Sequence, residues 1–164
     1  MDQIVNDIQV FVADLPPAIS VLAVALLGVV PFVESYLGTA IGSVAGVPLL
    51  LAYGAAVVGN AGAVLIASLA GGAVANRRHN KPAASDSRRA RVVARTDKYG
   101  VPLASLLAPT VLAISLTTFI MVSVGYARTR VVIWQIIAAI VWGGLVAGSL
   151  AGVGFLTGWG PLAG

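Results

Sequence analysis

Long apolar runs constrain what this chain can fold into more than any other feature. The chain has four of them, at residues 18–46, 48–75, 99–126 and 131–157. The first run has an internal proline, Pro31, and the third has Pro109 as well as Pro102 near its start, whereas the second and fourth run on without an internal one. An internal proline removes a backbone hydrogen bond and breaks or kinks a helix. At about 1.5 Å per residue, a proline-free run can extend roughly 40 Å, enough to cross a bilayer core of about 30 Å.

The composition places the chain among membrane proteins. Of its 164 residues, 59% are hydrophobic and 10% charged, and the mean hydropathy is +0.97. A soluble domain carries about 25% charged residues. There is no cysteine and one histidine, His79, which argues against a disulfide, a thiolate or histidine metal site, and a Ser-His-Asp triad. We therefore expect an all-α integral membrane protein that is not an enzyme and needs no metal or cofactor.

The basic residues predict an orientation. Eight of the ten Lys and Arg lie between Arg77 and Lys98, and the other two are Arg128 and Arg130. A basic loop beside apolar runs follows the positive-inside rule, so residues 76–98 are expected to be cytoplasmic and to contact lipid rather than nucleic acid. The expected location is a bacterial inner membrane, crossed more than once.

Two topologies can carry this pattern. With four simple spans, Arg128 and Arg130 would lie outside, and the Lys and Arg count would be eight inside against two outside. If each proline-containing run is instead a re-entrant hairpin, all ten basic residues lie inside. The second topology obeys the rule better and gives two halves of opposite orientation, as in inverted repeats. We favour it and leave the first open.

The expected organisation follows from that choice. It comprises an amphipathic interfacial helix at 1–16, a hairpin-plus-span repeat at 17–75, the basic loop at 76–98, a second hairpin-plus-span repeat at 99–157 and a tail at 158–164. Hairpin tips expose backbone groups that must be buried in protein or face water. Two spans are too few to enclose both tips, so we expect a homodimer or larger homo-oligomer. Small residues along both spans, including Gly59, Gly144 and Gly148, suit close helix packing.

Glu34 is the leading candidate for a functional residue. It is the only acidic residue between Asp14 and Asp86, and it follows Pro31 inside an apolar run. An ionised carboxylate at the bilayer centre costs roughly 3 kcal/mol, so an acid there is a functional-site hypothesis by default. Burial favours its neutral form until a cation or water path arrives, which suits exchange of a proton for a cation. A structural carboxylate that bonds the backbone opened by Pro31 is compatible with this.

Further candidates are weaker. Asn60 lies in the middle of the second run and needs a polar partner, which could be a hairpin tip, a substrate or another helix. Ser35 and Tyr36 are candidates because they adjoin Glu34. Pro109 and Thr110 mark the expected second tip, although hydroxyls in membrane helices usually bond their own backbone. Other polar residues of the fourth run, such as Gln135, are assigned to packing or interface anchoring.

Several of these residues also carry a family resemblance. The Pro31-x-x-Glu34 break, the Gly59-Asn60 pair and the Lys98-Tyr99-Gly100 start of the second half resemble the small multidrug export protein family over roughly residues 25–150. The resemblance implies a bacterial inner-membrane exporter.

The layout is more distantly similar to DedA/VTT membrane proteins. That likeness implies paired re-entrant hairpins with an acid in the first, matched by Glu34, and a proline in the second, matched by Pro109. It also implies a link to lipid-carrier translocation. The chain departs from that pattern because residues 104–118 carry no charge, whereas an arginine is expected near the second tip.

These observations favour a small membrane transporter that couples protons to export of a small cationic or lipophilic compound through a midplane site containing Glu34. One alternative is a DedA-like translocase or scramblase of polyprenyl phosphate. Another is a membrane assembly protein that transports nothing, in which Glu34 matters only for folding.

Overall fold

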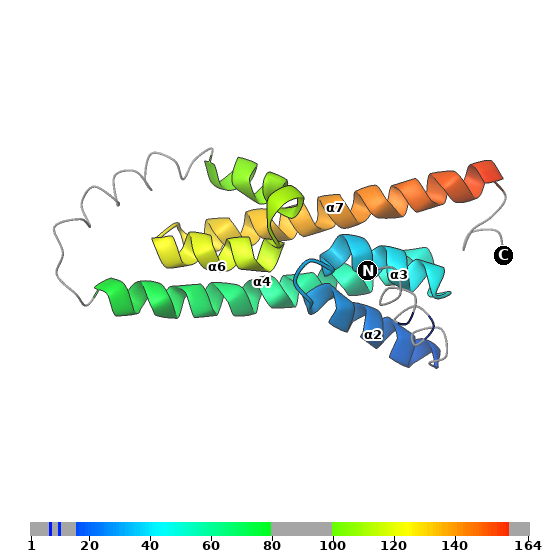
Figure 1. Cartoon of the computed structure of the whole chain (residues 1–164), viewed down its shortest axis with the longest axis horizontal. Helices are drawn as coiled ribbons and strands as arrows, with labels where there is room; N and C mark the ends of the chain where they lie inside the picture. The colour runs from blue at the N-terminus through cyan, green and yellow to red at the C-terminus, as the bar shows by residue number, and fades with distance from the viewer. Residues whose placement is uncertain (1–6, 8–9, 11–15, 80–99, 158–164) are drawn as a thin grey trace. The chain divides into compact units, whose positions relative to one another are not determined.

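The computed structural model of the chain describes residues 7, 10, 16–79 and 100–157. Within these residues the protein is all-helical, as expected (Figure 1). The amphipathic helix predicted at 1–16 and the tail at 158–164 fall almost wholly outside the described residues, and so does most of the loop at 76–98. The contacts divide the chain into two compact units, Met1–Ala61 with Ala139–Gly164 and Gly62–Ala138.

Two helices are long enough to cross a membrane. They are α4, Leu49–His79, and α7, Arg128–Thr157, and each contributes residues to both units. Within them, Leu49–Arg77 and Arg128–Leu156, 29 residues each, are apolar enough to span a bilayer. At about 1.5 Å per residue each stretch extends about 44 Å. The prediction of two proline-free long helices is confirmed.

Both long helices extend beyond their predicted ends. α4 continues into the segment expected to be loop, and α7 already begins at Arg128, before the apolar run at 131–157. Before α7, Gly125 at φ +107° ends the preceding helix, Ile114–Val124.

The first unit contains a helical hairpin made of α2, Pro17–Val29, and α3, Glu34–Val44. α2 ends before Pro31, and Val30 is extended at φ −70° and ψ 123°, as expected for the residue before a proline. The break predicted at Pro31 is therefore present, and α3 runs back beside α2 (Figure 1). One straight span over residues 18–46 is wrong, because neither helix exceeds 13 residues, or about 20 Å.

The second unit contains a comparable pair, helix Gly100–Val111 and α6, Ile114–Val124. Val101 at the start of the pair packs with Val122 near its end, so the two helices run in opposite directions. The break lies at Leu112 and Ala113, after Pro109 rather than at it. The expectation that Pro109 itself breaks the helix is wrong. Helical hydrogen bonding continues past the proline, where Leu112 N–H donates to Ala108 O at 2.7 Å.

Both hairpins end in the same way. At the end of α3, Val47 N–H donates to Gly42 O at 2.9 Å and Gly46, at φ +90°, donates to Ser43 O at 3.1 Å. At the end of α6, Tyr126 and Gly125 make the corresponding bonds to the carbonyls of Met121 and Val122. This is the Schellman pattern, in which a glycine takes the left-handed conformation after the last helical turn.

Candidate functional site

The tip of the first hairpin holds a buried carboxyl group. Glu34 is the first residue of α3 and is only 1% exposed. Its backbone is in the left-handed region at φ +50°, and so is that of Phe32 at φ +69°. Non-glycine residues rarely adopt this conformation, which costs roughly 1–2 kcal/mol each. The tip therefore holds its carboxyl group in the protein interior in spite of a strained backbone.

The residues next to Glu34 fix the tip to the rest of the first unit. Ser35 Oγ donates to the carbonyl oxygen of Ala139 in α7 at 2.8 Å, and Thr39 Oγ1 donates to Ser35 O at 2.6 Å. Tyr36 OH donates to the carbonyl oxygen of Phe32 at 2.8 Å. Each of these hydroxyls already donates to a backbone carbonyl, so their first role is to hold the tip in place.

Helix register brings Asn60 level with Glu34. A Cβ at Gly42 would lie 3.1 Å from Ala52 Cβ, and a Cβ at Gly38 would lie 3.1 Å from Ala56 Cβ. A step of four residues toward the start of α3 therefore corresponds to a step of four residues toward the end of α4. The next step pairs Glu34 with Asn60, so the expectation that these two residues share a site agrees with the register of the helices.

Asn60 is a polar side chain in an apolar surrounding. It is 0% exposed, and neither Oδ1 nor Nδ2 has a hydrogen-bond partner among the described residues. Burying an amide without a partner costs about 1–3 kcal/mol. The interhelical hydrogen bond that is one expectation for Asn60 is therefore absent from the described part of the chain, and both amide atoms remain able to bind a ligand or water.

Close packing of backbones makes this arrangement possible. A Cβ at Gly28 would collide with the carbonyl of Ala56, and a Cβ at Gly59 would collide with the carbonyl of Ala25. Glycine at both positions lets α2 and α4 touch directly. The small-residue face predicted for the second run is therefore used where α2 crosses α4, next to Asn60.

The predicted second tip is arranged differently. Thr110 is exposed, and its Oγ1 donates to the carbonyl oxygen of Leu107 in the same helix at 2.6 Å. Pro109 lies inside helix Gly100–Val111. The Thr110 hydroxyl therefore bonds the backbone of its own helix, which is the structural role that the sequence left open for it.

Ser105 is not singled out from the sequence, and Gln135 is assigned only to packing or interface anchoring. Ser105 and Gln135 are 0% exposed, and Ser105 Oγ, Gln135 Oε1 and Thr117 Oγ1 have no hydrogen-bond partner among the described residues. Two signals could have pointed to them. Ser105 lies four residues before Pro109, and Gln135 interrupts an otherwise apolar stretch.

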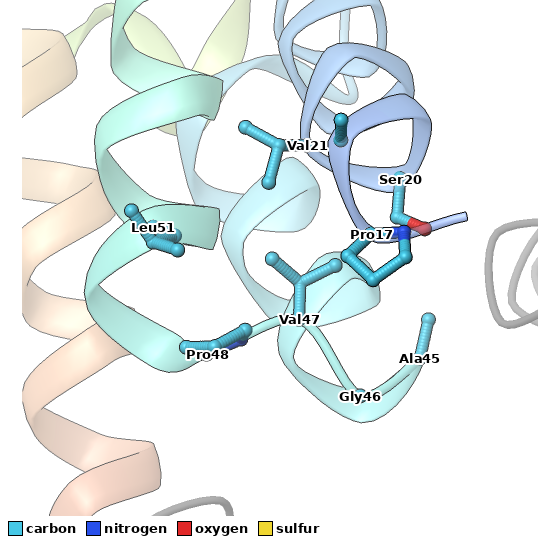
Figure 2. A pocket seen from close by; sticks show the side chains of 9 residues that line it. Pro17, Ser20, Val21, Ala45, Gly46, Val47, Pro48 and Leu51 are labelled. Carbon is cyan, nitrogen blue, oxygen red and sulfur yellow. The ribbon is translucent and has the colours of Figure 1, made fainter. Parts of the chain in front are cut away.

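The first unit also contains a cavity of about 430 Å³ that is separate from Glu34 (Figure 2). It lies at the open end of the hairpin, between Pro17 at the start of α2, Gly46 after α3 and Pro48 before α4. Its lining is mainly apolar, and the Ser20 hydroxyl there donates to Pro16 O at 3.1 Å. None of the predicted site residues lines this cavity.

No family model matches the chain, and neither a curated protein nor a solved structure is similar to it. The resemblance to small multidrug export proteins, and the more distant one to DedA/VTT proteins, therefore stay predictions from the sequence.

Proposed function

We propose that this protein is a small membrane transporter in which Glu34 exchanges a proton for a small cationic or lipophilic substrate. The observation that supports this most strongly is the nearly complete burial of Glu34, level with the buried amide of Asn60. A carboxyl group in such a place can stay neutral by binding a proton or stay ionised by binding a cation. Because the proton and the cation compete for the same carboxyl group, movement of one across the membrane is coupled to movement of the other.

Apolar residues on the surface of α4 support insertion in a membrane. Leu50 is 77% exposed, Val58 69% and Ile66 66%. Together with other exposed aliphatic side chains on the same helix, they form a surface that would bind lipid tails far better than water. The lengths of α4 and α7 fit a bilayer core.

The proposed topology has each hairpin re-entering the membrane and one long helix crossing it after each hairpin. The two halves would then be inverted repeats, with residues 76–98 cytoplasmic in a bacterial inner membrane.

A second copy of the chain is part of the proposal. A Cβ added at Gly148 or Gly152 of α7 would meet no described neighbour within 4 Å. Small residues on an uncovered helix face let a second helix approach closely in lipid. This part of α7 is therefore where a partner subunit would pack.

Uptake into proteoliposomes tests the proposal. A fluorescent organic cation should accumulate when a proton gradient is imposed, and Glu34→Gln should abolish the dependence on that gradient. Ser123→Ala is a matched control, because its hydroxyl donates to the carbonyl of Ile120 in its own helix, α6, which contains neither Glu34 nor the proposed subunit contact. Gradient-independent uptake by wild type and Glu34→Gln alike would refute the proposal. Binding of polyprenyl phosphate without cation transport would instead favour the lipid-carrier translocase.

A further inference from the structure

The second unit contains a buried group of oxygen atoms that the transport proposal does not use. It belongs to Ser105 in helix Gly100–Val111, Thr117 in α6 and Gln135 in α7. Ser105 Oγ, Thr117 Oγ1 and Gln135 Oε1 are all buried without a hydrogen-bond partner among the described residues. Such groups are costly to bury unless something binds them.

The register of a neighbouring apolar cluster indicates that the three residues lie at one level. Val101, Met121 and Val131, one from each helix, pack together. The first and third of these helices run toward the break, and α6 runs back from it. Moving one helical turn, or four residues, from this cluster toward the break reaches one polar residue on each helix. These are Ser105 after Val101, Gln135 after Val131 and, on the antiparallel α6, Thr117 before Met121.

A direct contact agrees with this register. Gln135 Nε2 lies 3.8 Å from Met121 Sδ, which ties the amide of α7 to α6. With the nitrogen toward the sulfur, the carbonyl oxygen of the amide is left for another partner.

Pro109 leaves a backbone carbonyl next to the Ser105 hydroxyl without its usual donor. A proline has no N–H, so Pro109 cannot donate to the carbonyl oxygen of Ser105, four residues earlier. The same residue thus contributes a hydroxyl and a carbonyl that lacks its usual helical donor. This gives Pro109 a physical role even though the helix continues past it.

The chemistry of the group is uncharged oxygen. The described part of the second unit contains no acidic residue, and the cations whose side chains are described there, Arg77, Arg128 and Arg130, are exposed at the protein surface. Arg128 Nε also donates to Ser68 Oγ at 3.1 Å. Divalent cations are held mainly with carboxylates, whereas Na⁺ in transporters is held by carbonyl oxygens at interrupted helices.

We propose that Ser105, Thr117 and Gln135, with the Ser105 carbonyl, form a binding site for a monovalent cation, with Na⁺ as the expected ion. The site is separate from Glu34 and does not depend on the proposed exchange of a proton there.

Thermal unfolding of the purified full-length protein in NaCl, KCl and choline chloride at equal ionic strength tests this proposal. A bound ion stabilises the folded state by mass action, so NaCl should raise the Tm of the wild type above its value in choline chloride. Gln135→Leu and Ser105→Ala should lower the apparent Na⁺ affinity about ten-fold or more, as expected for loss of one good ligand. Thr117→Val keeps the side-chain shape and should weaken the response without unfolding the protein.

Glu34→Gln is the control that separates this site from the transport proposal, and it should keep the full Na⁺ response. Direct ²²Na⁺ binding to wild type and Thr117→Val gives a second readout that does not depend on stability. Equal Tm values in all three salts, with no ²²Na⁺ bound, would overturn the proposal and leave buried water as the partner of these oxygens. An unchanged Na⁺ response in Gln135→Leu, Ser105→Ala and Thr117→Val would overturn it as well.

Discussion

At the scale of single residues, Glu34 and Asn60 pose the same energetic problem. Both are almost completely buried on neighbouring helices of one unit, and both are polar. The first turn of α3 offers Glu34 some electrostatic support, worth about 0.3–1 kcal/mol for a carboxylate near a helix N-terminus. That is less than the cost of burying an ionised carboxylate. The proposal that a substrate binds here gives both buried polar groups a role.

The substitution Asn60→Leu distinguishes these two roles. If the amide awaits a ligand, leucine removes an unpartnered polar group and should raise the stability of the ligand-free protein by about 1–3 kcal/mol while abolishing transport. Chemical denaturation in detergent and uptake in proteoliposomes measure the two effects. A large loss of stability would show instead that Asn60 holds helices together.

At the scale of elements, packing of glycine against backbone carbonyls sets the position of the first hairpin. Gly59→Ala would place a methyl group against the carbonyl of Ala25 and should cost about 1–3 kcal/mol, as overpacking does. Gly62→Ala, on the same helix, meets nothing within 4 Å and should be neutral or slightly stabilising. Denaturation of the two variants side by side measures the difference. Equal effects would mean that α2 and α4 are not in direct contact.

The elements can largely be predicted from the sequence. Apolar runs and the proline rule predict the long helices and the break at Pro31, because both effects are local. The second break lies later than predicted because a proline near the end of a helix removes one hydrogen bond without ending the helix. The candidate site is harder to predict. Glu34 is conspicuous as a lone charge, but the group around Ser105 and Gln135 depends on how three helices pack, which no local pattern encodes.

At the scale of the whole molecule, the proposed topology makes a prediction about sidedness. The chain has no cysteine, so single cysteines report position without interference. Val44, 64% exposed at the end of α3, and Ala127, exposed before α7, follow the two hairpins. With re-entrant hairpins, Val44→Cys and Ala127→Cys should react with a membrane-impermeant maleimide from opposite sides of the membrane. Labelling of both from one side would contradict the re-entrant topology.

The central claim is that one carboxyl group binds either a proton or a cation. Proton release from the purified protein in weak buffer, on addition of organic cations, tests it most directly. Wild type should release a proton as the cation binds, and Glu34→Gln should release none, while Ser123→Ala behaves as wild type. Cation binding without proton release in the wild type, or equal release by Glu34→Gln, would contradict the account.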